Sequence, residues 1–232
     1  MHCIVTAGAT WEPLDRVRRL TNFSTGSLGT TLARRLAAAG HSVDLFLAES
    51  IVWETSVPGI SPHRFSTTAT LEALFRSHRS SAPLAIFHAA AVSDFQSAGC
   101  FERTPDGTLN PLAAGKLSTR DGTLWVELRP TPKILPQLRD WFPAARIMGW
   151  KYETDGTRAD VLARVARQFA ESRTDACIAN GPAFGEGFSL VMPSGTFQHL
   201  PDRPALFDAL LAALEFTGSS PSSPSSPSQS GL

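Results

Sequence analysis

The stretch HCIVTAGAT (residues 2–10), followed after a gap by TNFSTGSLGTTLARRLAAAGHSVDLF (residues 21–46), decides the fold. Its first apolar run is typical of a buried strand, and residues 27–39 have the pattern of a helix that Gly40 ends. A second strand is expected over residues 42–48. A strand, a helix and a strand in this order form a right-handed crossover between parallel strands. The sequence therefore predicts the first unit of an α/β fold with a mostly parallel sheet.

The same alternation continues along the chain, with a third buried strand expected over residues 84–92. Further helices are expected over residues 67–77, 131–141, 157–172 and 203–215, further strands over residues 145–153 and 175–180, an exposed strand over residues 121–130 and a hairpin over residues 188–200. Pro132 is expected in the first turn of its helix, where its missing N–H costs nothing. These elements predict one three-layer Rossmann-like domain over residues 1–216, with helices on both faces of the sheet and a small β-hairpin element. Residues 217–232 are rich in Ser and Pro and are expected to form a disordered tail.

Composition argues against several classes of function. The formal net charge of the 232 residues is zero, so bulk charge gives no support to a nucleic-acid or anionic-membrane partner. The cysteines Cys3, Cys100 and Cys177 are odd in number and too widely spaced for a disulfide framework or a zinc site. Cys3 and Cys177, together with His88, are expected to be buried core residues. Because the sequence has no apolar run of about 18 residues and no signal peptide, we expect a cytoplasmic protein.

The turn over residues 22–29 has features of a phosphate-binding turn. Its small residues let backbone N–H groups approach an anion, and the helix that begins near Ser27 directs the positive end of its dipole there. The G-x-G-x-x-G pattern of dinucleotide-binding folds is absent, and WEPLDRVRRL (residues 11–20) separates the turn from the first strand. An ordinary loop capped by Ser24 or Thr25 is the alternative.

Other candidate ligand-binding side chains follow the expected strands, at the edge where open α/β sheets bind ligands. Asp94 comes after the third strand and could contact a metal ion, a ribose or a base, or could only cap the next segment. Lys116 and Lys133 could bind phosphates, although each could equally be a solvated surface lysine. Trp150 and Lys151 could stack on a base and pair with a phosphate, or could simply close the core.

Seven segments occur in the order seen in one enzyme family. They are VTAGATWEPLD, TNFSTGSLG, AAAVSDF, GKLS, TPKIL, GWKYETD and IAN. In this combination the chain resembles the phosphopantothenoylcysteine synthetases of coenzyme A biosynthesis, and the resemblance covers about residues 1–215. In that family the sheet binds a nucleoside triphosphate and 4′-phosphopantothenate. The resemblance implies that the long first connection makes room for the second substrate.

The resemblance also implies a two-step reaction. The carboxylate of 4′-phosphopantothenate attacks the α-phosphorus of CTP or ATP and expels pyrophosphate. The amine of L-cysteine then attacks the acyl-nucleotide and releases the nucleoside monophosphate. Mg²⁺ is expected to bind mainly through the nucleotide, with no metal ligand from the protein, and no FMN is expected because the resemblance covers the synthetase half alone. A homodimer is implied, since in the family the region of TLWVELR (residues 123–129) helps to dimerise and the partner completes the pantothenate site.

The family's functional residues can be carried over onto matching positions. Asn22 and Lys116 are the implied catalytic residues: Asn22 orients the pantothenoyl group, and Lys116 contacts phosphates and developing charge. Asn22, Thr25 and Asn180 are expected to bind the substrate. The nucleotide-binding residues are expected to be Gly8, Ser24, Gly26, Ala89, Ala90, Ala91, Asp94, Lys116, Pro132, Lys133, Ile134, Leu135, Trp150 and Lys151.

Several positions depart from the family pattern and leave the choice between CTP and ATP open. Trp11 stands where the family commonly has a basic residue. Bacterial members, which use CTP, carry two lysines on the helix before IAN, where this chain has Gln168 and Ser172 with Arg167 and Arg173 alongside. Other motifs are closer to those of the eukaryotic branch, which uses ATP.

Two other functions stay open from the sequence. A short-chain-type NAD(P) oxidoreductase would need a tight glycine turn after the first strand and a Tyr-x-x-x-Lys pair. Tyr152 is the only tyrosine, and ETDG (residues 153–156) follows it, which counts against that class. A non-catalytic nucleotide-binding relative would keep the fold without turnover, and the substituted basic positions are compatible with such a protein.

Overall fold

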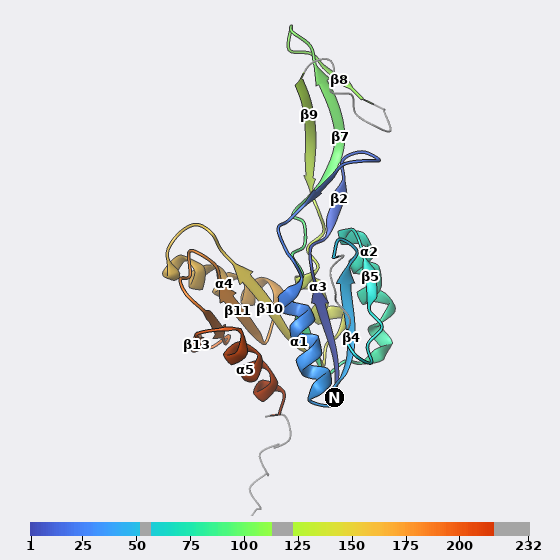
Figure 1. The fold of residues 1–232 in the computed structure, drawn as a ribbon. Coiled ribbons are helices and arrows are strands. Elements are labelled where there is room, and N and C mark those ends of the chain that lie inside the picture. Colours follow the sequence, from blue (N-terminus) through green and yellow to red (C-terminus); the bar gives the residue numbers. More distant parts are fainter. Residues whose placement is uncertain (52–56, 113–122, 216–232) are drawn as a thin grey trace, which may run out of the picture.

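The computed structural model describes residues 1–51, 57–112 and 123–215 (Figure 1). An eight-stranded sheet forms the centre of the molecule, and a three-stranded arm projects beyond it (Figure 1). Lys116 and the expected tail over residues 217–232 lie outside the described residues.

The central sheet confirms the predicted α/β class. Its strands, in spatial order, are β13 (Phe197–Leu200), β12 (Phe188–Val191), β11 (Ala176–Asn180), β10 (Arg146–Tyr152), β6 (Ala85–His88), β1 (His2–Ala7), β4 (Ser42–Ala48) and β5 (His63–Phe65). The strands from β11 to β5 are parallel, whereas β12 and β13 form the predicted antiparallel hairpin. The parallel strands therefore have the order of a doubly wound nucleotide-binding fold, with the first strand in the middle.

Helices cover both faces of this sheet, as predicted. On one face α1 (Ser27–Ala38) packs on β1 and β4 and contacts α5 (Arg203–Glu215) (Figure 1). On the other face α2 (Thr68–Ser77), α3 (Leu135–Trp141) and α4 (Arg158–Ser172) lie in a row, each in contact with the next. Together the sheet and the two helical faces form three layers.

The core lies between these layers and is built from the central strands. Phe46 and Phe87 are almost fully buried, and burial of a side chain of this kind contributes about 1.5–3 kcal/mol to folding. Cys3 and Cys177 are buried as expected, and this burial raises the pKa of the Cys3 thiol to about 11 and that of Cys177 to about 12. Both thiols are therefore protonated and unreactive at neutral pH.

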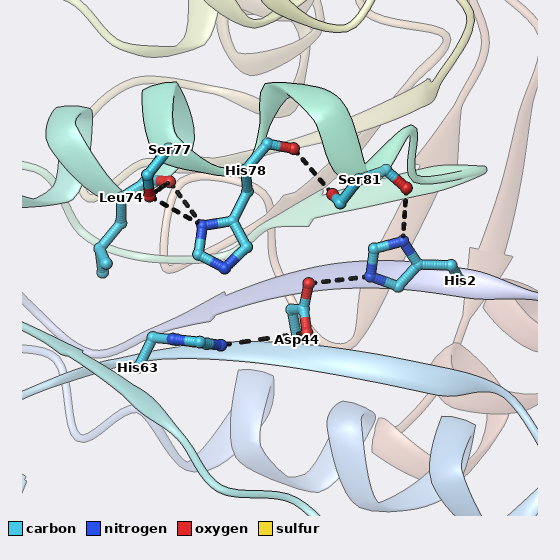
Figure 2. Close-up of polar contacts among 7 residues, drawn as sticks. All are labelled: His2, Asp44, His63, Leu74, Ser77, His78 and Ser81. Atoms are coloured by element: carbon cyan, nitrogen blue, oxygen red, sulfur yellow. Dashed lines mark hydrogen bonds and ion pairs between the residues drawn. The ribbon is translucent and has the colours of Figure 1, made fainter.

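Side chains from four elements meet at the amino-terminal edge of the sheet (Figure 2). His2 Nε2 of β1 lies 2.8 Å from Asp44 Oδ2 of β4, and His63 Nε2 of β5 lies 4.0 Å from Asp44 Oδ1. His78, at the end of α2, packs edge-on against the ring of His63, with the ring centroids 4.6 Å apart. These contacts connect the first strands to α2 at the edge of the sheet opposite to the carboxyl ends of the strands.

Caps determine where the helices begin. Thr67 and Thr157 each form a capping box with the third residue of α2 and of α4, which satisfies backbone N–H groups that have no partner within the helix.

The prediction that Pro132 lies in the first turn of its helix is wrong. The helix α3 starts three residues later, at Leu135, and Pro136 takes the early position at which a missing N–H costs nothing.

The projecting arm is an antiparallel sheet of β7 (Phe95–Arg103), β8 (Leu109–Pro111) and β9 (Thr123–Pro130) (Figure 1). A two-stranded ribbon of β2 (Trp11–Pro13) and β3 (Arg19–Thr21) lies at its base, where β2 contacts β7. The sequence predicts β9 but neither β7 nor β8. It also predicts a longer third strand, whereas β6 ends at His88 and the chain turns away to enter the arm.

Candidate active site

The carboxyl ends of β1 and β6 mark the point where the order of the parallel strands reverses. From β1 the chain crosses to β4 and β5 on one side, and it then returns to β6 on the other side. Crossover connections leave these two neighbouring strands in opposite directions, and the crevice between them is where doubly wound sheets bind ligands.

The turn over residues 22–29 packs onto the end of β1, although residues 8–21 separate it from that strand. Gly26 is the N-cap residue of α1 and has a φ of 69°. A Cβ atom on Gly26 would lie 3.1 Å from the backbone N of Gly8 and 2.2 Å from Ile51 Cδ1, so the close approach requires glycine. Neither alternative cap is the N-cap residue of α1. Thr25 Oγ1 accepts a long hydrogen bond of 3.4 Å from the backbone N of Ser27 and donates one of 3.1 Å to Ser27 Oγ.

Asn22 connects this turn to the segment that follows β6. Its side-chain Nδ2 donates a hydrogen bond of 3.1 Å to the backbone oxygen of Val92. The backbone N of Ala91 in turn donates to the oxygen of Gly8 at 2.9 Å. The turn, the end of β1 and the segment after β6 therefore form one connected unit, in which the Asn22 side chain is exposed.

A cleft of about 550 Å³ opens beside this unit, between the segment after β6, the start of α3, the end of β10 and the exposed side of α4. Its lining residues are His88, Ala90, Val92, Ser93, Asp94, Lys133, Ile134, Leu135, Pro136, Trp150, Lys151, Glu153, Arg164, Arg167, Gln168, Glu171 and Ser172. The volume lies within the range of small-molecule sites, which are usually about 300–1,000 Å³.

Ion pairs organise the charged side chains of the cleft. Lys133 Nζ donates to Asp94 Oδ1 at the rim, where both side chains are exposed. Deeper in the wall, Glu153 accepts from Arg164 Nη1 at 2.5 Å and lies 3.3 Å from Lys151 Nζ. A bound anion would therefore compete with carboxylates for Lys133, Lys151 and Arg164.

Aromatic residues form the inner part of the cleft. Trp150 is half-buried against the core, and its indole Nε1 is buried without a hydrogen-bond partner among the described residues. His88 is buried and lies 3.0 Å from Thr6 Oγ1, and loss of hydration lowers its pKa to about 4. His88 is therefore neutral at physiological pH, which confirms the expectation of a core histidine.

The structure brings part of the predicted nucleotide site together. Ala90, Asp94, Lys133, Ile134, Leu135, Trp150 and Lys151 all line the cleft. Gly8, Asn22, Ser24, Thr25, Gly26, Ala89, Ala91, Pro132 and Asn180 do not line it. Lys116 falls outside the described residues.

Asn180 is placed behind the cleft wall. Its backbone oxygen accepts from the backbone N of Glu153, and its buried side-chain Oδ1 has no partner among the described residues. Asn180 therefore contacts Glu153, which lines the cleft, but Asn180 is not part of the lining.

Sequence reasoning missed several residues of the α4 wall. Arg164, Gln168 and Glu171 recur at intervals of three to four residues, which places them on one face of a helix. The amide of Gln168 reaches so close to β10 that a Cβ atom on Gly149 would lie 2.6 Å from its Nε2. The available signals were this helical spacing and the two lysines that the bacterial family carries at the positions of Gln168 and Ser172, but neither reveals which face of the helix meets the cleft.

Neither a metal site nor a membrane span is found in the part of the chain that the structure describes. Across residues 1–51, 57–112 and 123–215, no three His, Cys, Asp or Glu side chains are grouped so that they could hold a metal ion. No helix in these ranges has the length and apolar character needed to cross a membrane.

A comparison with protein families identifies residues 1–190 as a match to the "DNA/pantothenate metabolism flavoprotein C-terminal domain". The chain belongs to this family. The matched region contains β1 to β11 and both walls of the cleft, so the site described above lies within the flavoprotein C-terminal domain.

Curated relatives are similar to this chain over aligned regions that cover part of their own length. The "Coenzyme A biosynthesis bifunctional protein CoaBC" of Thermococcus kodakarensis is 29% identical over 186 residues, which cover 78% of this chain and 42% of the relative. The human "Phosphopantothenate--cysteine ligase" is 28% identical over 207 residues, which cover 66% of this chain and 63% of the relative. The chain thus spans about half the length of these two relatives.

Solved structures share the fold of the flavoprotein C-terminal domain. The DNA/pantothenate metabolism flavoprotein from Streptococcus pneumoniae superposes with a TM-score of 0.80 at 23% identity, covering 93% of this chain and 99% of that one. This agreement confirms the Rossmann-like architecture predicted from the sequence.

Proposed function

We propose that the chain is a nucleotide-dependent ligase that joins 4′-phosphopantothenate to L-cysteine. The observation that carries the proposal is the cleft at the strand switch point, which combines an aromatic inner wall with cations on two sides. Its membership of the pantothenate flavoprotein family and its similarity to the human phosphopantothenate--cysteine ligase supply the substrate class. A nucleotide fits such a cleft, because a base can stack on Trp150 while lysine and arginine pair with phosphates.

In the proposed reaction a carboxylate is first activated. One carboxylate oxygen of 4′-phosphopantothenate bonds to the α-phosphorus of CTP or ATP as the bond to the pyrophosphate leaving group breaks. The amine of L-cysteine then bonds to the acyl carbon, and the nucleoside monophosphate leaves with that carboxylate oxygen. The protein's contribution is to hold both substrates in place and to compensate negative charge on the phosphates.

The proposed roles of individual residues follow from their positions. Asn22 lies next to the cleft wall and still has its side-chain oxygen available to orient the pantothenoyl amides. Asp94 and Lys133 must exchange their mutual ion pair for contacts with the nucleotide, for example with a ribose hydroxyl and a phosphate. Lys116 remains the proposed second catalytic residue by resemblance to the family.

Mg²⁺ enters this proposal as part of the nucleotide substrate. The described carboxylates of the cleft do not form a metal-binding set, because Asp94 pairs with Lys133 and Glu153 pairs with two cations. We therefore propose that the ion is carried by the nucleotide phosphates. CTP and ATP are both candidates for this nucleotide.

We also propose that two copies associate through the arm. Phe95, Leu124 and Leu128 on β7 and β9 are each between 41% and 46% exposed, and strand alternation and register place all three on one face of the arm. Exposed apolar patches of this kind mark interaction surfaces. A second copy supplies the same surface, so a symmetric contact can cover both arms.

A product assay tests the proposed function. Purified protein is incubated with 4′-phosphopantothenate, L-cysteine, Mg²⁺ and either CTP or ATP, and the products are identified by mass spectrometry. We expect the amide of phosphopantothenate and cysteine, with one nucleoside monophosphate and one pyrophosphate for each amide, and we expect the Lys116→Gln variant to form far less. Nucleotide binding without any amide would contradict the ligase and favour a non-catalytic nucleotide-binding protein.

A further inference from the structure

Most of the cations that line the cleft already have carboxylate partners. Lys133 pairs with Asp94, and Glu153 pairs with both Lys151 and Arg164. These contacts neutralise much of the charge that a phosphate would need.

Arg164 is also committed to a structural contact. Besides its ion pair with Glu153, its Nη1 donates a hydrogen bond of 3.0 Å to the backbone oxygen of Asp155. This guanidinium therefore connects α4 to the loop that follows β10. Moving it onto a ligand would break both contacts, which makes it an unfavourable phosphate ligand.

Arg167 differs from these residues. It lines the cleft from the middle of α4, is exposed, and makes no ion pair with any residue that the structure describes. Glu171 lies one turn further along the same helix and would be the usual i,i+4 partner, yet the two side chains do not pair. Its guanidinium is thus available at the wall of the cleft without the loss of an existing contact.

We propose that Arg167 binds a substrate phosphate group, most simply one in the polyphosphate chain of the nucleotide. The inference rests on the proposed function, which places phosphorylated substrates in this cleft. A guanidinium suits the task because its planar set of donors matches two phosphate oxygens at once. The phosphate of 4′-phosphopantothenate has the same chemistry and is the alternative source.

Binding measurements without turnover separate these possibilities. Isothermal titration calorimetry measures the affinity of wild type, Arg167→Gln and Arg167→Lys for CTP, ATP, the corresponding monophosphates and 4′-phosphopantothenate, each added alone. The matched control is Arg158→Gln, because Arg158 lies on the same helix but packs over the rings of Phe184 and Phe197, away from the cleft lining. Thermal melting of each variant confirms that the fold is intact.

We expect Arg167→Gln to weaken triphosphate binding at least about tenfold, as for the loss of a charged hydrogen bond. Arg167→Lys should recover part of the affinity, and monophosphate binding and the Arg158→Gln control should stay within about twofold of wild type. A loss confined to 4′-phosphopantothenate would support phosphate binding and assign it to that substrate. Unchanged affinity of Arg167→Gln for every phosphorylated ligand, or a wild type that binds none of them, would overturn the proposal. Normal binding without amide formation would contradict only the ligase.

Discussion

Single side chains beside the cleft hold in place the segments to which we assign ligand binding. Asn22 uses its Nδ2 to fix the turn over residues 22–29 to Val92, while its side-chain oxygen has no hydrogen-bond partner among the described residues. Gly8 and Gly26 allow the same turn to approach the end of β1. A turn that is distant from the first strand in sequence is thereby held at the strand's carboxyl end, as a phosphate-binding turn would be.

The proposed role of Asn22 predicts a large loss of activity with little change in stability. Asn22→Ala should reduce amide formation by a factor that corresponds to about 2–4 kcal/mol, as for the loss of a donor or acceptor that acts in the transition state. The melting temperature should fall by no more than about 2 °C, because the side chain is exposed and makes one hydrogen bond. Gln198→Ala, an exposed amide on β13, serves as the control in both measurements. Turnover of Asn22→Ala close to that of wild type would remove Asn22 from the mechanism.

The burial of His88 in its neutral form predicts that acid destabilises the fold. Its pKa is about 4 in the folded protein and 6.5 as the ordinary value, so the unfolded state binds more protons between these pH values. The contribution of His88 to the free energy of unfolding is therefore fully present above pH 6.5 and is lost as the pH falls. At pH 4 the loss from this group alone is roughly 3 kcal/mol.

Urea unfolding of wild type, His88→Gln and the exposed control His199→Gln between pH 7.5 and 4.5 tests this dependence. The free energy of unfolding should fall less steeply with acid in His88→Gln than in the other two proteins. Parallel curves for all three would show that His88 does not contribute to the acid sensitivity.

At the level of elements, the sequence predicts those strands and helices whose ends and buried faces are marked by neighbouring residues. The strand over residues 42–48 and the helix over residues 203–215 are observed with their predicted bounds, because apolar periodicity and clear end signals mark them. The strand β7 was missed because FQSAGCFER (residues 95–103) lacks regular alternation and includes an irregularity between Ser97 and Gly99. That strand exists through its pairing with the distant β9, which no local pattern reports.

The same limit applies to the candidate site. Motifs indicated Asp94, Lys133 and Trp150, which follow strands or precede a helix and come together at one edge of the sheet. The spacing of the arginines on α4 predicts that they lie on one face of the helix. Whether that face lines the cleft depends on how α4 packs against α3 and β10. Pairing between charges, such as that of Glu153 with Arg164, likewise depends on tertiary contacts.

The arm predicts an effect on assembly. Leu128→Ser removes an exposed apolar side chain from β9, on the face of the arm that also carries Leu124. Because this side chain belongs to the surface proposed to join two copies, the variant should shift from dimer to monomer in light scattering coupled to size-exclusion chromatography. Met192→Ser, at an exposed apolar residue away from the arm, should leave the assembly unchanged. A wild type that is already monomeric at high concentration would contradict the proposed association.

At the scale of the whole molecule, the two edges of the sheet have different structures. The amino-terminal edge carries the contacts of His2, Asp44 and His63, which connect adjacent strands (Figure 2). The carboxyl ends carry the cleft, and the arm projects beyond the sheet (Figure 1). Such a division is typical of doubly wound folds, in which a stable sheet supports ligand-binding segments at one end.

The central claim is that this cleft activates a carboxylate by forming an acyl-nucleotide. The most direct measurement uses 4′-phosphopantothenate with both carboxylate oxygens labelled with ¹⁸O, together with L-cysteine and the preferred nucleotide, and follows the label by mass spectrometry. The account predicts that one ¹⁸O atom appears in the nucleoside monophosphate, one stays in the amide carbonyl, and none enters pyrophosphate. Amide formation without label in the monophosphate, or label in a released phosphate, would contradict attack at the α-phosphorus and with it the proposed mechanism.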